Sequence, residues 1–514
     1  MSPKGTTRDN SPQLLFAAWQ VVTVFTIVLA VQLWSIRRLL APSIAVKSSD
    51  RPFIVFCSSE LEHLTAGGAG VVVADSARAL YRAGWHVLII LDVIGETQGV
   101  LDKWAARAQK VWGRRQQHHA EQDRPARATT RPTGKINLLQ LSDLAEEIDD
   151  NVSGHQSLSS QLWDKSRQWS RAVARFQGVA DAIEFFDCGG PAYHTLLKRN
   201  KGAYQFPLET QIWIRTHGMH QAIADGEGGG ARKGGARSVH LPKLHAQLET
   251  VYAMETRALQ MADAVIANSL GIAREYASTY DLDESRRVTV ISPTLGTLQD
   301  IIDFDQDRPH HYVRSPESEF INILVYGKLQ RVKGPDLAAK ALVMAMRELA
   351  SKWDGEVIFA GDDMPCDNDP SLKMSTCLAS LIPSDLSSRF RFTGRIKRGS
   401  LGKFARRERI GFAILPSRYE TFCLAAHEAS FFGIFLVLPR LPAYEGFFVD
   451  GENAAMFDGQ SPDDLARVIR QELLHLTSER GSAVVAARPP IFYSNPSESY
   501  ATLMFPWTVR SPGD

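Results

Sequence analysis

The chain has 514 residues, of which 44% are hydrophobic and 22% charged, and its formal net charge is +1. This composition is typical of a folded globular protein rather than a disordered one, and the length predicts two or more domains. The balanced charge gives no indication of a nucleic-acid partner. The five cysteines are scattered and show no C-x-x-C spacing. The sequence therefore predicts neither a zinc site nor a disulfide framework.

An uncharged apolar stretch covers residues 14–36. At about 1.5 Å per residue, a helix of this length would cross the ~30 Å hydrocarbon layer of a membrane. Trp19 and Trp34 lie near its two ends, where interfacial aromatic residues are expected. A cleaved signal peptide is the alternative, although its apolar region is normally shorter. We therefore predict a tail at 1–13, a transmembrane anchor at 14–36 and a stem at 37–50.

The charges that flank the apolar stretch favour a cytosolic catalytic part. Two basic residues precede the stretch and four follow it as far as residue 51, and basic residues are more frequent on the cytosolic side. A Golgi-lumen placement is the alternative, and the sequon at 151–153 would suit it.

Short apolar runs alternate with helical patterns along the rest of the chain. A first set covers 52–57, 86–91, 136–141, 182–186, 211–217 and 264–268, and a second covers 321–327, 356–361, 389–394, 411–416, 434–439 and 454–458. Because these runs are apolar throughout, they are expected in parallel sheets that are covered on both faces. Two consecutive βα arrays predict two doubly wound, Rossmann-like α/β domains, at 51–310 and 319–486, followed by a segment at 487–514. Ligands in this architecture bind at the carboxyl ends of strands, here expected between the domains.

A basic insert at 102–135 is rich in Arg, Lys and His. We interpret it as a solvated surface loop or helix, and an anionic partner or lipid surface is the alternative.

The first motif that indicates chemistry is "AGGAG" at 66–70, after a strand and before a helix. Gly67, Gly68 and Gly70 would let backbone N–H groups approach a phosphate at a helix N-terminus. A dinucleotide fingerprint, with Asp92 as the ribose-binding acid, is the alternative. That fingerprint requires a tight strand-to-helix turn and a third glycine. Here about ten residues separate Cys57, the end of the strand, from Gly67, and Val73 stands in place of the third glycine.

The second motif is "YGKLQRVKG" at 326–334, at the end of the first strand of the second array. Lys328 and Lys333 flank a short loop that opens a helix. Two ammonium groups at the carboxyl edge of a parallel strand are well placed for a pyrophosphate. Ordinary surface lysines are the alternative.

The third motif is "SRYETFCLAAHE" at 417–428, which follows a strand. We expect its helix to begin near Thr421 or Phe422, so that the N–H groups of Thr421, Phe422 and Cys423 form an anion site. Glu420 would lie at its lip, and Glu428 about 12 Å along the axis at ~1.5 Å per residue. Leu424 shares the apolar helix face of Glu428 and is expected to contribute to the same binding site.

This spacing suits a sugar nucleotide, with its diphosphate at the helix N-terminus, sugar hydroxyls at Glu420 and ribose hydroxyls at Glu428. A carboxylate that accepts hydrogen bonds from a diol offsets its own desolvation. A buried glutamate that pairs with an arginine or a backbone donor is the alternative. The Asp362-Asp363 pair is interpreted as a turn rather than a metal site.

Together, the "E-x7-E", "G-K-L-x-x-x-K-G" and "GG-x-G" patterns resemble the retaining glycosyltransferases of family 4, the group 1 glycosyl transferases, which have the two-domain GT-B fold. The resemblance runs from about Arg51 to the C-terminus. It includes the stretches at 184–194, 213–218, 262–269 and 449–457, and a segment at 493–504 that is similar to the family's return helix.

The resemblance implies that the chain is a retaining hexosyl-type glycosyltransferase, in which sugar passes from a UDP- or GDP-sugar to a glycan, lipid or protein acceptor. It implies no metal or other cofactor. Lys328 and Lys333 would hold the leaving diphosphate, and Gly68 would allow its close approach. Glu420 would bind the donor sugar, Glu428 the ribose, and His217 would lie near the transferred sugar.

Three departures from the family pattern affect the donor site. Lys328 stands where the family usually has Arg, Cys423 replaces a Gly, and Leu441-Pro442-Ala443 stands where a Gly-Gly is usual. A catalytically weak GT-B scaffold that binds partners therefore remains an alternative, and a nicotinamide-dependent oxidoreductase is a second one.

Overall fold

The computed structural model describes residues 51–62, 64, 67–93, 96–122, 134–144, 157–201, 210–227, 242–282, 287–298, 321–349, 353–367, 369–477 and 496–504. The apolar stretch at 14–36, its flanks at 1–13 and 37–50, and the sequon at 151–153 lie outside these ranges. Within the described ranges, no helix is both long and apolar enough to span a bilayer. The transmembrane anchor therefore stays a prediction.

The first sheet has seven parallel strands in the order β3-β2-β1-β4-β5-β6-β7. These strands are β1 (Phe53–Ser58), β2 (His86–Leu91), β3 (Lys135–Gln140), β4 (Ala182–Phe186), β5 (Gln211–Arg215), β6 (Ala264–Ala267) and β7 (Arg287–Val290). The first six correspond to the predicted apolar runs. The sequence did not predict β7, whose four residues alternate polar and apolar side chains.

The second sheet has six parallel strands in the order β12-β9-β8-β13-β14-β15. They are β8 (Asn322–Tyr326), β9 (Val357–Ala360), β12 (Phe390–Phe392), β13 (Ile410–Ile414), β14 (Phe435–Pro439) and β15 (Ala454–Phe457). All six were predicted as strands. In both sheets the strand order reverses beside the first strand, between β1 and β4 and between β8 and β13, and such switch points are where doubly wound folds bind ligands.

Helices cover the first sheet. On one face α2 (Gly68–Arg82), α3 (Gln98–Gln122) and α16 (Pro496–Met504) share an apolar core with β1, β2 and β3. The basic insert contributes to this core, because Ala105, Ala108 and Trp112 on α3 are buried. On α5 (Leu158–Val173), Trp169 packs edge-on against Phe185 of β4. Helix α5 also contacts α4 (Leu141–Leu144), α6 (Tyr193–Asn200) and α8 (Pro242–Met261), and α7 (His220–Glu227) and α9 (Leu270–Thr279) complete the domain.

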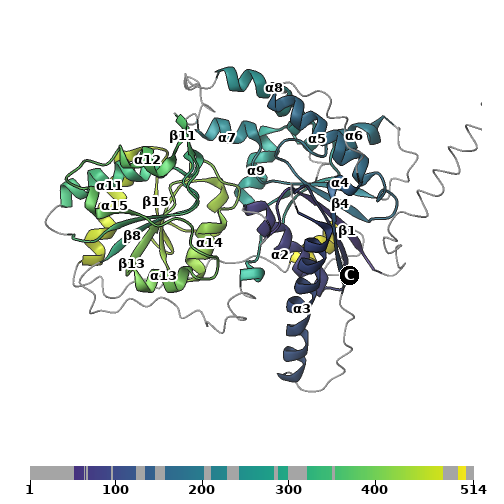
Figure 1. Ribbon diagram of the computed structural model, residues 1–514, viewed down its shortest axis with the longest axis horizontal. Helices are drawn as coiled ribbons and strands as arrows, with labels where there is room; N and C mark the ends of the chain where they lie inside the picture. The colour runs from purple at the N-terminus through teal and green to yellow at the C-terminus, as the bar shows by residue number, and fades with distance from the viewer. Residues whose placement is uncertain are drawn as a thin grey trace, which may run out of the picture. The chain divides into compact units, whose positions relative to one another are not determined.

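The C-terminal helix α16 packs on the first domain, beside α2 (Figure 1). Its Tyr500 hydroxyl accepts from Nη2 of Arg215 at 2.5 Å and donates to Oε2 of Glu184 at 2.7 Å. Arg215 also donates from Nε to Oε1 of Glu184 at 2.6 Å, and all three side chains are buried. Each of the three side chains thus bonds to the other two, and this buried polar cluster joins α16 to strands β4 and β5, as expected of a return segment.

The second sheet is covered on both faces. Helices α11 (Pro335–Leu349), α12 (Met374–Ala379) and α15 (Pro462–Thr477) pack on the face that holds Ile323 and Val325. Helices α13 (Leu401–Arg407) and α14 (Leu424–Phe431) pack on the face that holds Leu324. Figure 1 shows α11 and α15 on the side of this sheet away from α13 and α14. Three short 3-10 turns lie at Arg331–Lys333 (η2), Ser387–Arg389 (η3) and Pro442–Tyr444 (η4).

The sequence predicted no disulfide framework, but the structure contains a disulfide. A hairpin of β10 (Pro365–Cys366) and β11 (Asp369–Lys373) precedes α12, and Cys366 forms a disulfide with Cys377 on that helix. The eleven-residue separation matches no diagnostic spacing, so only the hairpin shows that the two thiols meet.

Candidate active site

A cavity of about 370 Å³ lies where β5, β8 and β13 end. Nine of the predicted site residues line it: Gly68, His217, Lys328, Lys333, Glu420, Thr421, Phe422, Cys423 and Leu424. Gly67, Gly70 and Glu428 are not among its lining residues. The structure thus brings the three sequence motifs, which come from distant parts of the chain, around one space.

Lys333 and Glu420 form an ion pair in this cavity. Nζ of Lys333 lies 2.7 Å from Oε1 of Glu420, which also accepts from the Ser417 hydroxyl at 2.8 Å. Burial alone would lower the pKa of Lys333, but the adjacent Glu420 carboxylate raises it above its ordinary value. Lys333 is therefore a fixed positive charge at neutral pH.

Arg418, which sequence reasoning missed, fastens the two loops that carry this pair. Its guanidinium donates two parallel hydrogen bonds of 2.8 Å to the Asp336 carboxylate, and its backbone N–H donates to the carbonyl of Val332. Gly334, between Lys333 and Asp336, has a positive φ of 69°, and a Cβ there would lie 2.0 Å from the carbonyl oxygen of Pro416. The glycine of the K-G motif is thus required by both backbone conformation and close packing.

His217 follows β5 and is held by Asp187, another residue that the sequence did not single out. Oδ1 of Asp187 accepts from the backbone N–H groups of His217 and Gly218, at 2.9 and 3.2 Å, and Oδ2 accepts from the Tyr276 hydroxyl at 2.7 Å. Burial lowers the pKa of His217 to about 4, and the positive charge of Lys333 acts in the same direction. The imidazole is therefore neutral at physiological pH.

Helix α14 begins at Leu424, two or three residues later than the predicted start at Thr421 or Phe422. The reason is Cys423, whose φ of 57° and ψ of 72° are left-handed and interrupt the helix. The first amide N–H groups of the helix are therefore those of Leu424 and Ala425, which both line the cavity, rather than those of Thr421 and Phe422. The left-handed conformation also explains why glycine is favoured at this position in the family pattern.

Glu428 makes the contact that the sequence left as its alternative. Its Oε1 accepts from Nε of Arg398 at 2.6 Å, and its Oε2 lies 3.5 Å from the hydroxyl of Tyr326, which lines the cavity. Arg398 also contacts the carboxylate of Glu62 and donates to the Thr297 hydroxyl at 2.9 Å. The glutamate is therefore buried as half of an ion pair at the edge of the cavity.

The glycine-rich loop at the start of α2 is occupied by a side chain. Oε2 of Glu60 accepts from the N–H of Gly70 at 3.3 Å, and a Cβ on Gly67 would lie 1.9 Å from the same carboxyl group. Gly70 itself has no room for a Cβ beside the backbone of Leu61. A carboxylate thus lies where the sequence predicts phosphate, while Gly68 lines the cavity.

The remaining predicted features lie apart from this cavity. Asp363 accepts from both the N–H and the hydroxyl of Ser375, at 2.9 and 2.6 Å, so its carboxylate stabilises the start of α12. In place of the usual Gly-Gly, Leu441-Pro442-Ala443 runs into the 3-10 turn η4, where the carbonyl of Pro442 accepts from the Ser269 hydroxyl.

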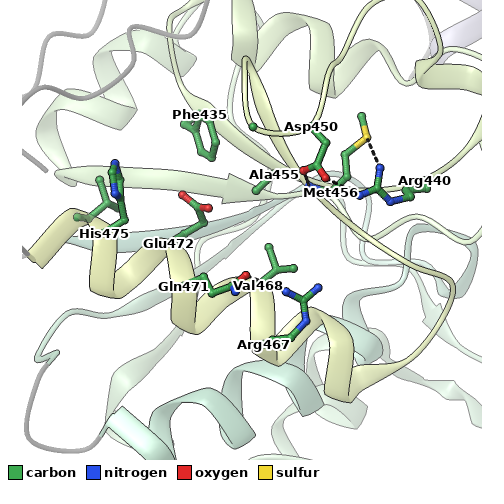
Figure 2. Close-up of a pocket in the computed structure, with 13 residues that line it drawn as sticks. Phe435, Arg440, Asp450, Ala455, Met456, Arg467, Val468, Gln471, Glu472 and His475 are labelled. Atoms are coloured by element: carbon green, nitrogen blue, oxygen red, sulfur yellow. Dashed lines mark hydrogen bonds and ion pairs between the residues drawn. The ribbon is translucent and has the colours of Figure 1, made fainter.

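A second cavity, of about 520 Å³, lies between α15 and the strands β14 and β15 (Figure 2). Arg467, Gln471, Glu472 and His475 face it from the helix, and Arg440 pairs with Asp450 at its other end. None of the predicted site residues lines it, although Asp450, Gly451, Ala455 and Met456 belong to the family-like stretch at 449–457.

Comparisons with known proteins agree with the resemblance seen in the sequence. Residues 310–483 match the family described as Glycosyl transferases group 1. D-inositol 3-phosphate glycosyltransferase 1 from Catenulispora acidiphila is 27% identical over 239 residues, which are 45% of this chain and 54% of that protein. The chain thus matches about half the length of this curated relative.

Solved structures extend the similarity to both domains. Sucrose-phosphate synthase from Thermosynechococcus elongatus superimposes with a TM-score of 0.53 at 16% identity, over 88% of this chain and 95% of that chain. The catalytic domain of starch synthase IV from Arabidopsis thaliana, bound to ADP and acarbose, gives 0.55 at 15% identity, over 89% and 99%. At such identities the likeness shows the fold, and the predicted GT-B architecture is confirmed.

Proposed function

We propose that this protein transfers a sugar from a UDP- or GDP-sugar to a glycan, lipid or protein acceptor, with retention of anomeric configuration; the match of residues 310–483 to the group 1 glycosyl transferases supports this proposal. The observation that carries this proposal is the convergence of His217, Lys328, Lys333 and Glu420 with the start of α14 around one cavity. Two lysines and free helical amides supply positive potential for a diphosphate, and a carboxylate and an imidazole supply partners for sugar hydroxyls.

In this proposal the protein acts mainly by positioning and charge stabilisation. Lys328, Lys333 and the amides of Leu424 and Ala425 receive the negative charge that develops on the leaving diphosphate. The leaving phosphate oxygen accepts the proton of the acceptor hydroxyl as the new glycosidic bond forms on the same face. The neutral His217 can donate one hydrogen bond to the transferred sugar without adding a charge.

We further propose that residues 14–36 anchor the protein in a membrane. The Cys366–Cys377 disulfide supports a catalytic part in an oxidising compartment, because disulfides persist there and are rare in the cytosol. It therefore favours the Golgi-lumen alternative over the cytosolic placement that the flanking charges suggest. Protection of the catalytic part from protease in sealed microsomes would support the lumenal placement, and digestion without detergent would contradict it.

The donor site is tested by two isosteric substitutions in the full-length chain. Glu420→Gln is expected to lower turnover ~100-fold with little change in donor affinity, since it removes charge at the reacting sugar. Glu428→Gln separates the two roles of Glu428: a ribose that replaces Arg398 as its partner would make UDP or GDP binding about tenfold weaker in this variant, a change of about 1.4 kcal/mol, whereas unchanged binding would leave Glu428 as the ion-pair partner of Arg398 alone. Calorimetry with UDP and GDP and a screen of nucleotide-sugar hydrolysis measure the two effects.

Glu348→Gln is the matched control, because Glu348 is exposed on α11 and pairs with Arg470 at the surface, away from the cavity. If both site variants behaved like the parent, the site assignment would be wrong. A folded parent that binds neither UDP nor GDP would favour the scaffold alternative. Stabilisation by NAD(P) instead of UDP would favour the oxidoreductase.

A further inference from the structure

Three side chains that the proposed transfer does not use meet beside the cavity. Cys188 follows β4, His220 begins α7, and Glu255 lies in the middle of α8. Sγ of Cys188 is 3.7 Å from Nδ1 of His220, and Nδ1 is 2.7 Å from Oε1 of Glu255. One nitrogen, one sulfur and one oxygen atom thus lie within 4.8 Å of one another.

This arrangement is not that of a nucleophile, base and acid in series. In such a relay the nucleophile contacts one ring nitrogen of the histidine and the carboxylate contacts the other. Here the sulfur and the carboxylate both approach Nδ1 of His220. Three donor atoms that lie this close to one another can instead be ligands of a single ion.

Glu255 supplies a second, independent observation. Its side chain is fully buried, and Oε1 accepts from the N–H groups of Gly189 at 2.8 Å and His220 at 3.1 Å. Oε2 is also buried, and within the described ranges no group donates a hydrogen bond to it. A buried carboxylate oxygen without a partner is costly, and a bound cation would remove that cost.

We propose that Cys188, His220 and Glu255 form a Zn²⁺ site. Zinc accepts thiolate, imidazole and carboxylate ligands, and bond lengths of about 2.0–2.3 Å place tetrahedral donor atoms roughly 3.3–3.6 Å apart. The sulfur–nitrogen distance of 3.7 Å lies about 0.1 Å above this range, and the hydrogen bond between His220 and Glu255 lengthens when the ion enters. Binding releases the thiol proton and the Nδ1 proton to solvent. The thiolate and the carboxylate then balance the charge of the ion.

The ion would have both a route of entry and a structural consequence. Cys188 lines the cavity beside His217, so the site can be reached from the same space. The ion would join the loop after β4 to α7 and α8. Asp187, the neighbour of Cys188 in that loop, accepts from the backbone N–H of His217. Zinc would therefore stabilise the loop that positions His217.

The test uses the full-length chain, stripped of metal with a chelator and then titrated with Zn²⁺ or Co²⁺. We expect about one ion per chain and, with Co²⁺, the absorption band of a cobalt–thiolate bond. Cys188→Ser should abolish that band and lower affinity at least ~100-fold, more than the loss of an outer-shell partner costs. Glu255→Gln should also weaken binding. Cys423→Ser, which changes another thiol in the cavity, is the control and should retain both the band and the affinity.

A measurement on the unaltered protein covers the case in which a variant fails to fold. Zn²⁺ should protect Cys188 from alkylation, as mapped by mass spectrometry, while alkylation of Cys423 should not depend on the metal. A folded chain that binds neither metal would overturn the proposal, as would Cys188→Ser binding like the parent or alkylation of Cys188 that ignores Zn²⁺. The cluster would then be an ion pair of His220 and Glu255 beside a thiol.

Discussion

Cys423 has a left-handed backbone conformation and immediately precedes helix α14. This conformation costs a residue with a side chain roughly 1–2 kcal/mol relative to glycine. The strain lies directly beside the amides of Leu424 and Ala425 that we assign to the diphosphate. A single residue thus links a departure from the family pattern to the local stability of the site.

We predict that Cys423→Gly gives a more stable protein than Cys423→Ala, by about 1 kcal/mol in the free energy of unfolding. Both variants lose the buried thiol, so the difference between them reports the backbone alone. In ordinary helical positions the order is the opposite, because glycine is worse than alanine by about 0.5–1 kcal/mol. Denaturant unfolding of the two variants measures the difference, and greater stability of the alanine variant would contradict the left-handed assignment.

At the scale of elements, two strand-to-helix loops carry Lys333 and Glu420 to the cavity, and the Arg418–Asp336 ion pair joins the two loops. The loop after β8 carries Lys333, and the loop after β13 carries Glu420. Because the guanidinium presents two parallel N–H groups to the carboxylate, it fixes the angle as well as the distance between the loops.

Arg418→Lys keeps the charge and removes the second hydrogen bond. We expect turnover to fall about tenfold and the free energy of unfolding to fall by about 1–2 kcal/mol, since a misplaced charge at the reacting centre is costly. Arg440→Lys is the matched control, because the Arg440–Asp450 pair is about half exposed and such pairs contribute little. Steady-state kinetics and denaturant unfolding measure the two changes, and equal effects at both positions would contradict a positioning role for Arg418.

At the scale of the whole molecule, most strands and their arrangement in two doubly wound domains could be predicted, because buried parallel strands are apolar throughout and stand out in the sequence. The weak strand β7 could not, since Arg287 and Thr289 interrupt its apolar character. Nine of the predicted site residues line one cavity, because motifs at the carboxyl ends of strands converge in this fold. The Arg398 contacts with Glu428 and Glu62 and the Cys366–Cys377 disulfide depend on tertiary packing, which local spacing does not specify.

The Tyr500 cluster gives a prediction about global stability. Tyr500→Phe keeps the ring but leaves a buried N–H of Arg215 and an oxygen of Glu184 without their shared hydroxyl. We expect a loss of about 2–4 kcal/mol, because both groups belong to a buried ion pair. Tyr193→Phe, at a half-buried position packed against Trp163, should change stability by less than ~0.5 kcal/mol. Thermal unfolding compares the two variants, and equal melting temperatures would refute the cluster's contribution.

The same cluster shows that the N-terminal domain is built from two separate segments of the sequence. A fragment that stops at residue 310 would contain Glu184 and Arg215 but not the phenol between them, so it would fold around an incomplete core. Added in trans, a peptide of residues 496–504 would supply the missing ring and hydroxyl. Fragment complementation should therefore succeed with that peptide and fail with its phenylalanine counterpart, which would make residues 496–504 a ligand of the protein's own N-terminal half.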